Sequence, residues 1–146
     1  KHKPVLKIAT GRRFPTFILP CHIILGHIRD RIIPHPNHQR ATTMLLDEVG
    51  GLSTASKILK SQTGWYENGN GTDGVGFSAL PAGGWDVGNS EFFAGGRLAN
   101  FWSASGDYTS NFSAYHMDLS YEDDHANLTG YYKKYGFSVR CLKDDP

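Results

Sequence analysis

The glycine and aromatic residues of this 146-residue chain are concentrated after residue 40, and this distribution constrains the fold more than any other feature. The chain contains 17 Gly, 8 Phe, 3 Trp and 7 Tyr, and only two glycines and two aromatic residues precede residue 41. Glycine favours turns and irregular loops, and aromatic residues favour short buried strands. The length suffices for one domain with its own core. We therefore expect one compact domain over residues 41–146, and not a helical bundle.

The charge of the chain divides at the same point. Residues 1–40 carry eight Lys or Arg and a single acid, Asp30, whereas the remaining residues carry seven basic and thirteen acidic side chains. Clustered cations such as Gly11-Arg12-Arg13 can neutralise phosphates of nucleic acid or lipid. However, no stacking aromatics are interleaved with these charges, and no nucleic-acid-binding motif has the required spacing. We therefore predict a basic segment of uncertain structure over residues 1–40, and no nucleic-acid partner.

No stretch reaches the roughly 18 apolar residues that a membrane-spanning helix needs. Residues 17–25 are the most apolar, but Pro20 and His22 interrupt them, and Pro20 stands where a lipoprotein signal needs a small residue. We predict neither a transmembrane segment nor a signal here, so any export signal was removed or lay upstream of Lys1. Two alternatives stay open for the cysteines, because Cys21 and Cys141 either form a disulfide or remain free thiols.

Two helices are predicted before the glycine-rich region. Apolar residues recur every three or four positions from about residue 38 to Val49, and Gly50-Gly51 then ends this helix. A second helix is expected to begin at Ser53, a suitable N-cap residue, and to end near Ser61. After residue 64 the sequence is rich in turn-forming residues, because Gly and Asn can adopt positive φ.

Short strands follow these helices. Residues 92–93 and 101–103 are predicted to be short buried strands, and apolar and polar side chains alternate from 115 to 121. This alternation predicts a half-buried strand with His116 on its polar face. Residues 137–142 are the expected hairpin partner of this strand.

Seven short motifs in a fixed order point to a known family. They are Val49-Gly50-Gly51, Leu59-Lys60-Ser61, Gly64-Trp65, Asn70-Gly71-Thr72-Asp73, Gly76-Phe77-Ser78-Ala79-Leu80-Pro81, Phe101-Trp102-Ser103 and Gly136-Phe137-Ser138-Val139-Arg140-Cys141. Over roughly residues 42–143 the chain resembles the Fibrobacter succinogenes major paralogous domain family. The resemblance implies an extracytoplasmic bacterial protein, either secreted or at the cell surface.

The resemblance also implies the fold, because this family is similar to C-type lectins and to formylglycine-generating-enzyme-like domains. We therefore expect an α+β, C-type-lectin-like domain with two helices around a small twisted antiparallel sheet and long irregular loops rich in glycine and aromatics. The first 40 residues depart from the family, since its Cys-Pro-x-Gly-Trp-x-x-Pro stretch and its Glu-Trp pair are missing. Cys21 stands where the first family cysteine belongs, and its pairing with Cys141 stays open.

Polar and aromatic residues between Ser103 and Tyr132 form the candidate ligand-binding surface. Tyr offers a large contact area at low entropic cost, and Asn adapts its hydrogen bonds. The alternative is cross-strand packing and turn formation. The candidate residues are Asp107, Tyr108, Asn111, His116, Asp118, Glu122, Asp123, Asp124, His125, Asn127, Tyr131 and Tyr132. A further hypothesis is that this segment is diversified among relatives.

Calcium is the one cofactor that the sequence suggests. Asn68, Asn70 and Asp73 present oxygen atoms on a glycine-rich loop, and Ca²⁺ prefers oxygen ligands. Turn formation explains the same residues equally well. Both interpretations stay open at this point, and no other cofactor is expected.

The predicted function is binding or adhesion through an unknown protein or glycan ligand at the cell surface. No GxSxG elbow, HExxH motif, phosphate loop or Rossmann fingerprint occurs, so we predict no enzyme and assign no catalytic residue. The main alternative is a structural spacer domain within a larger surface protein. An enzyme of the formylglycine-generating type is the less favoured alternative.

Overall fold

The structure, a computed structural model, describes residues 42, 45–106 and 110–140 of the chain. The predictions for the basic segment and for Cys21 and Cys141 lie outside these residues, as do those for Asp107 and Tyr108. In the described part, no helix is long and apolar enough to cross a membrane.

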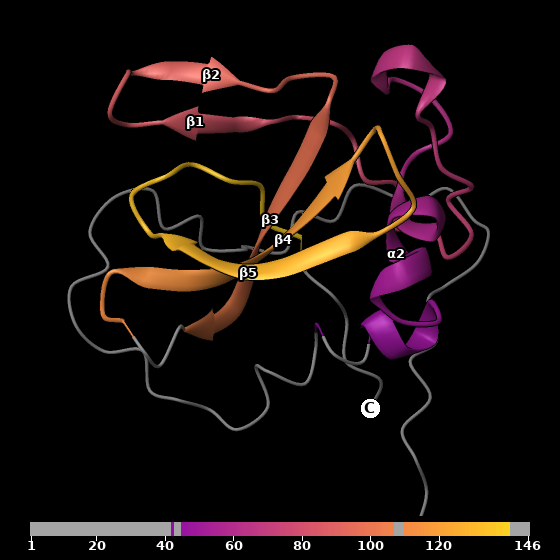
Figure 1. The fold of residues 1–146 in the computed structure, drawn as a ribbon, viewed down its shortest axis with the longest axis horizontal. Coiled ribbons are helices and arrows are strands. Elements are labelled where there is room, and N and C mark those ends of the chain that lie inside the picture. Colours follow the sequence, from indigo (N-terminus) through magenta and orange to yellow (C-terminus); the bar gives the residue numbers. More distant parts are fainter. Residues whose placement is uncertain (1–41, 43–44, 107–109, 141–146) are drawn as a thin grey trace, which may run out of the picture.

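Helices and short antiparallel strands make up the described part, which confirms the α+β class (Figure 1). Helical residues 45–48 come first, followed by α2 (Leu52–Leu59) and the 3₁₀ helix η1 (Tyr66–Asn68). The strands are β1 (Gly84–Asp86), β2 (Glu91–Phe93), β3 (Leu98–Gly106), β4 (Ser113–Ser120) and β5 (Ala126–Tyr132). One sheet pairs β1 with β2, and the larger sheet has the order β3-β4-β5. In Figure 1 the β1–β2 hairpin lies above the larger sheet and α2 lies to its right.

The helix α2 begins directly after two glycines that end the helical turn before it. Gly50 and Gly51 have φ values of 82° and 90°, a region that favours glycine. The second predicted helix is confirmed, because α2 spans Leu52–Leu59 and Lys60 is already extended. The prediction of Ser53 as its N-cap is wrong, since Gly51 is the N-cap and no side chain caps the helix. The helix predicted from about residue 38 is confirmed for residues 45–48, and its start lies outside the described residues.

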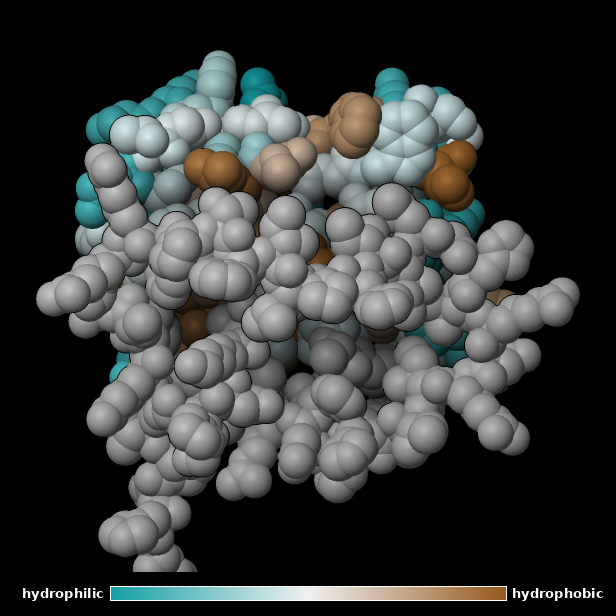
Figure 2. Space-filling model, turned by 180° about the vertical axis from the view of Figure 1, so that it is seen from behind, coloured by the Kyte–Doolittle hydropathy of each residue, from teal (hydrophilic) through white to brown (hydrophobic). Residues whose placement is uncertain are grey.

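The hydrophobic core lies between the helices and one face of the larger sheet. Leu45 and Leu59 come from the helical side, and Met117 and Leu119 come from β4. The predicted strands at 92–93 and 101–103 are confirmed as parts of β2 and β3, and that at 115–121 is confirmed in β4 up to Ser120. The predicted burial of 92–93 is wrong, because Phe92 is 79 % exposed. On the side seen in Figure 2, hydrophilic and hydrophobic residues are interspersed over the upper, coloured part of the surface.

The hairpin partner of β4 differs from the prediction. The structure pairs β4 with β5 at residues 126–132, in a register that aligns Met117 with Leu128, and not with the described residues 137–140 of the predicted partner. The chain instead returns beside β3 in parallel, where Trp102 N donates to Ser138 O (3.0 Å) and Ser138 N donates to Asn100 O (2.9 Å). Because β3 and β5 already occupy both edges of β4, the closing segment cannot pair with β4, and it pairs with the outer edge of β3.

Candidate functional site

The predicted ligand-binding residues are divided along the β4–β5 hairpin. Four of them occupy the loop between the two strands, namely Glu122, Asp123, Asp124 and His125. His116, Asp118 and Asn127 lie within the paired strands, and Asn111, Tyr131 and Tyr132 lie at the far end. The structure therefore does not gather them into one site.

The loop between β4 and β5 is held against α2 by a buried lysine. Lys60 is 2 % exposed, and its Nζ donates to Ser120 O (2.8 Å) and Asp123 O (3.0 Å). Burial lowers the pKa of Lys60, and the carboxylates of Asp124 and Asp123 raise it in part. Lys60 therefore bridges the carbonyls of Ser120 and Asp123 through part-buried hydrogen bonds. We call the loop of residues 121–125, which Lys60 holds against α2, the docked loop.

Other bonds of the docked loop also serve the fold. The amide of Ser56 donates to Asp124 O (3.0 Å), and Lys57 Nζ lies 3.5 Å from Asp124 Oδ2. Asp123 Oδ1 accepts a hydrogen bond from the His125 amide (2.9 Å), which closes a turn. A hydrogen bond to Glu122 raises the pKa of Tyr121. The polar residues of this loop are thus engaged in local structure.

The three residues predicted to hold calcium make the hydrogen bonds of the turns in which they lie. Asn70 Oδ1 accepts from the Trp65 amide (3.1 Å), and Asn70 Nδ2 donates to Asn68 Oδ1 (3.0 Å). Asp73 accepts both from the amide of Ser78 (2.7 Å) and from its hydroxyl (2.5 Å). These bonds favour the turn interpretation. Among the described residues, no three His, Cys, Asp or Glu side chains form a group that could hold a metal ion.

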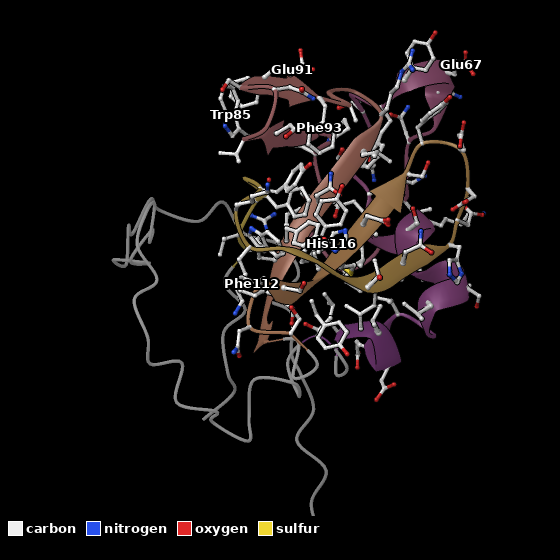
Figure 3. The ribbon with its side chains drawn as sticks, turned by 60° about the vertical axis from the view of Figure 1, so that its left-hand side comes forward. Glu67, Trp85, Glu91, Phe93, Phe112 and His116 are labelled. Atoms are coloured by element: carbon white, nitrogen blue, oxygen red, sulfur yellow. The ribbon has the colours of Figure 1, made fainter. Side chains whose placement is uncertain are left out.

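His116 is buried, so the prediction that it lies on an exposed polar face is wrong. It is 4 % exposed, and its ring centroid lies 5.0 Å from that of Phe137 and 5.3 Å from that of Tyr131. Its Nδ1 lies 3.0 Å from Thr129 O, and a carbonyl can only accept, so Nδ1 carries the proton. The cause is the return of residues 136–138 beside β3, which places Phe137 over this face of the sheet. Figure 3 shows His116 within the group of rings on the sheet.

Asp118 and Asn127 face each other across β4 and β5. Asn127 Nδ2 donates to Asp118 Oδ2 (3.2 Å), and Asn127 is exposed. The second oxygen, Asp118 Oδ1, is buried, and no described residue donates to it. This pair therefore links the two strands and leaves the Asn127 side chain at the surface.

The far end of the hairpin exposes large aromatic side chains. Phe112 is 77 % exposed, Tyr132 58 % and Tyr131 38 %. We call these three residues, with Lys133 and Lys134, the aromatic end. Figure 3 shows Phe112 at the lower left of the coloured part, far from Glu67 at the upper right.

Neighbouring residues fix the shape of the aromatic end. Lys133 Nζ donates to Asn111 O (3.0 Å), and Lys134 Nζ lies 5.9 Å from the Tyr132 ring centroid. The ring of Tyr135 supports Tyr131 at a centroid distance of 4.8 Å. Burial, followed by the carboxylate of Asp86, raises the pKa of Tyr135. A hollow of about 390 Å³ is lined by Asn111, Phe112, Tyr132, Lys133 and Lys134.

Sequence reasoning missed the lysines and Phe112 at this end. The sequence contains a signal for this cluster of aromatic and basic residues. Two lysines directly follow Tyr131-Tyr132, and an aromatic residue precedes the strand that begins at Ser113. Their convergence depends on the pairing of β4 with β5, and the predicted hairpin partner was a different segment.

The family motifs themselves lie mainly in the framework. Trp65 Nε1 donates to Ser61 Oγ (3.1 Å) and to Ala79 O (3.2 Å). The guanidinium of Arg140 donates to Phe77 O and lies 5.3 Å from the centroid of that ring. These bonds of the motif residues therefore stabilise the fold.

Comparison with known proteins identifies a family. The sequence profile described as the Fibrobacter succinogenes major domain matches residues 32–143. No curated protein and no solved structure matches the chain.

Proposed function

Because the chain belongs to the Fibrobacter succinogenes major domain family, we propose that it is a ligand-binding or adhesion module that contacts its ligand through the aromatic end. The proposed role is binding without catalysis and without a bound metal. The observation that carries the proposal is the exposure of Phe112, Tyr131 and Tyr132 on one end of a hairpin. Clustered exposed apolar side chains on a soluble domain are typical of interaction sites.

The chemistry of the aromatic end suits recognition. Tyrosine presents a flat apolar ring together with a hydroxyl, so one side chain can supply both contact area and a hydrogen bond. The hydrogen bond of Lys133 to Asn111 O and the packing of Tyr135 on Tyr131 hold the surface before a ligand arrives. Preorganisation of this kind lowers the entropic cost of binding.

We also propose that the domain acts outside the cytoplasm and has a C-type-lectin-like arrangement. Support for the location comes from the resemblance to secreted and surface-anchored bacterial proteins. Support for the arrangement comes from the two helices beside small antiparallel sheets and from the return of residues 136–138 to the sheet. Long loops rich in glycine connect these elements.

A glycan and protein array probed with the full chain tests the proposal. We expect binding to at least one ligand, with affinity reduced about tenfold or more by Tyr132→Ala and by Phe112→Ala. Phe92→Ala is the matched control, because Phe92 is 79 % exposed but lies on β2. Binding should be equal in Ca²⁺ and in chelator.

Three outcomes would contradict the proposal. A folded chain that binds nothing on the arrays favours the spacer alternative. Equal losses in Phe92→Ala and Tyr132→Ala would place the ligand elsewhere. If binding is lost in chelator and is also lost in the Asp73→Ala variant, the calcium interpretation is favoured instead.

A further inference from the structure

The strand β5 forms an edge of the larger sheet. Within the described part of the chain, β5 pairs with β4 alone, in a continuous antiparallel register from Ser113↔Tyr132 to Leu119↔Ala126. An edge strand presents a row of backbone N–H and C=O groups that can pair with another strand.

The hydrogen-bond pattern identifies which groups point outward. Lys133 N donates to Phe112 O (2.9 Å), so this pair is of the hydrogen-bonded type. Because the type alternates along an antiparallel ladder, Thr129 and Tyr131 also direct their backbone groups toward β4. The contact of His116 Nδ1 with Thr129 O agrees with this direction. The N–H and C=O groups of Leu128 and Gly130 therefore point away from the sheet.

The sequence of β5 does not protect this edge. Soluble proteins usually block an exposed edge with proline, lysine, a bulge or a very short strand. Residues 126–132 contain no proline and no charged residue, and their register with β4 shows no shift. Thr129, Tyr131 and Tyr132 instead favour strand formation.

The charges at the two ends of β5 are opposite. Glu122, Asp123 and Asp124 lie just before the strand, and Lys133 and Lys134 lie just after it. In an antiparallel pair of two identical strands, the acidic end of one copy lies beside the basic end of the other. The edge is therefore complementary to itself.

We propose that two copies of the chain pair through β5 in an antiparallel, two-fold arrangement centred on Thr129. This register is the only one that overlaps the whole of Ala126–Tyr132, and it aligns the outward-pointing residues Leu128 and Gly130 of the two copies with each other. Leu128, 37 % exposed, then lies beside Gly130 of the second copy, which has no side chain to obstruct it. Lys134 lies beside Asp124 of the second copy.

The dimer goes beyond the proposed binding function and gives it a geometry. The aromatic ends of the two copies lie at opposite ends of the paired strands, so the dimer would engage two ligands at once. A seven-residue edge buries little area, and we therefore expect a weak dimer that forms with rising concentration.

Sedimentation of the full chain tests the pairing directly. Over loading concentrations from about 10 μM to about 1 mM we expect a shift from monomer to dimer. Thr129→Lys places two like charges at the two-fold axis, and it should raise the dimer Kd about tenfold or more. Thr63→Lys is the matched control, since Thr63 is also exposed but lies outside β5. A monomer at every concentration, or equal effects of both substitutions, overturns the proposal.

A mixing experiment tests the register. A Lys134→Glu chain and an Asp124→Lys chain should each dimerise less than the native chain, because each places like charges together across the pair. The mixture of the two should regain dimer, because both contacts become attractive between different chains. If the mixture dimerises no better than its components, the antiparallel register is wrong. Circular dichroism of each chain alone establishes that it is folded.

Discussion

At one end of the β4–β5 hairpin the docked loop is fastened to α2 by a buried lysine, whereas at the other end Phe112, Tyr131 and Tyr132 are exposed to solvent. The composition of the two ends suggests the opposite roles. The loop is rich in the acidic and polar residues expected of a ligand site, and the strand end is rich in the aromatics expected of a core. The comparison shows that polarity alone does not identify a binding surface.

The difference follows from what each end must satisfy. A loop that crosses a helix has carbonyl groups shielded from water, and each needs a donor. Lys60 supplies two such bonds, and the Ser56 amide supplies another. At the aromatic end β4 and β5 already pair most of the backbone, so the aromatic side chains there are not needed to satisfy it, and Lys133 donates to Asn111 O.

Lys60→Met should have the largest effect on this contrast. The substitution keeps the apolar stem but removes the Lys60 donor to Ser120 O and Asp123 O, and it leaves Ser120 O with the longer bond from Ser56 Oγ (3.4 Å). We expect the free energy of unfolding to fall by about 3 kcal/mol, measured by urea denaturation. Lys57→Met is the control, because its ion pair with Asp124 is exposed and should contribute less than about 0.5 kcal/mol. Equal effects would mean that the loop is not docked by Lys60.

Gly71→Ala should have the next largest effect. A Cβ atom at this position would lie 2.5 Å from Lys60 Cβ and from Lys60 O, so the backbone at Gly71 would have to move away from Lys60. We expect a loss of about 2 kcal/mol in the free energy of unfolding. Gly95→Ala is the matched control, since no atom lies within 4 Å of its Cβ position. A stable Gly71→Ala variant would show that the packing around Lys60 is loose.

Phe112→Ser should have the smallest effect on stability. The side chain is 77 % exposed, so its removal should change the free energy of unfolding by less than about 0.5 kcal/mol. Thermal and urea denaturation of the variant measure this directly. A loss above about 1 kcal/mol would mean that Phe112 belongs to the core, and it would remove the aromatic end as a binding surface.

The sequence predicted the elements that carry a clear local signal. The alternation around Met117 and Leu119 located β4, and Gly50-Gly51 located the break before α2. β5 was missed because Asn127, Thr129 and Gly130 resemble loop residues, and an exposed edge strand needs no apolar alternation. Its pairing with β4 is a contact that local sequence does not encode.

The site was predictable only in part for the same reason. Tyr131 and Tyr132 were among the predicted residues and lie at the aromatic end, but the acidic residues 122–124 lie at the docked loop. His116 was expected to be exposed, since the strand pattern cannot show that Phe137 returns to cover it. The burial of Lys60 was equally hidden, because a lone lysine near the end of a helix normally lies in water.

The return of the chain beside β3 also affects the timing of folding. Ser138 bonds to Asn100 and Trp102, and Arg140 bonds to Phe77, 63 positions earlier. The sheet therefore cannot be completed until residue 140 has been synthesised, and contacts of such sequence separation form slowly. We expect the nascent domain to stay incompletely folded until residue 140 has emerged from the ribosome.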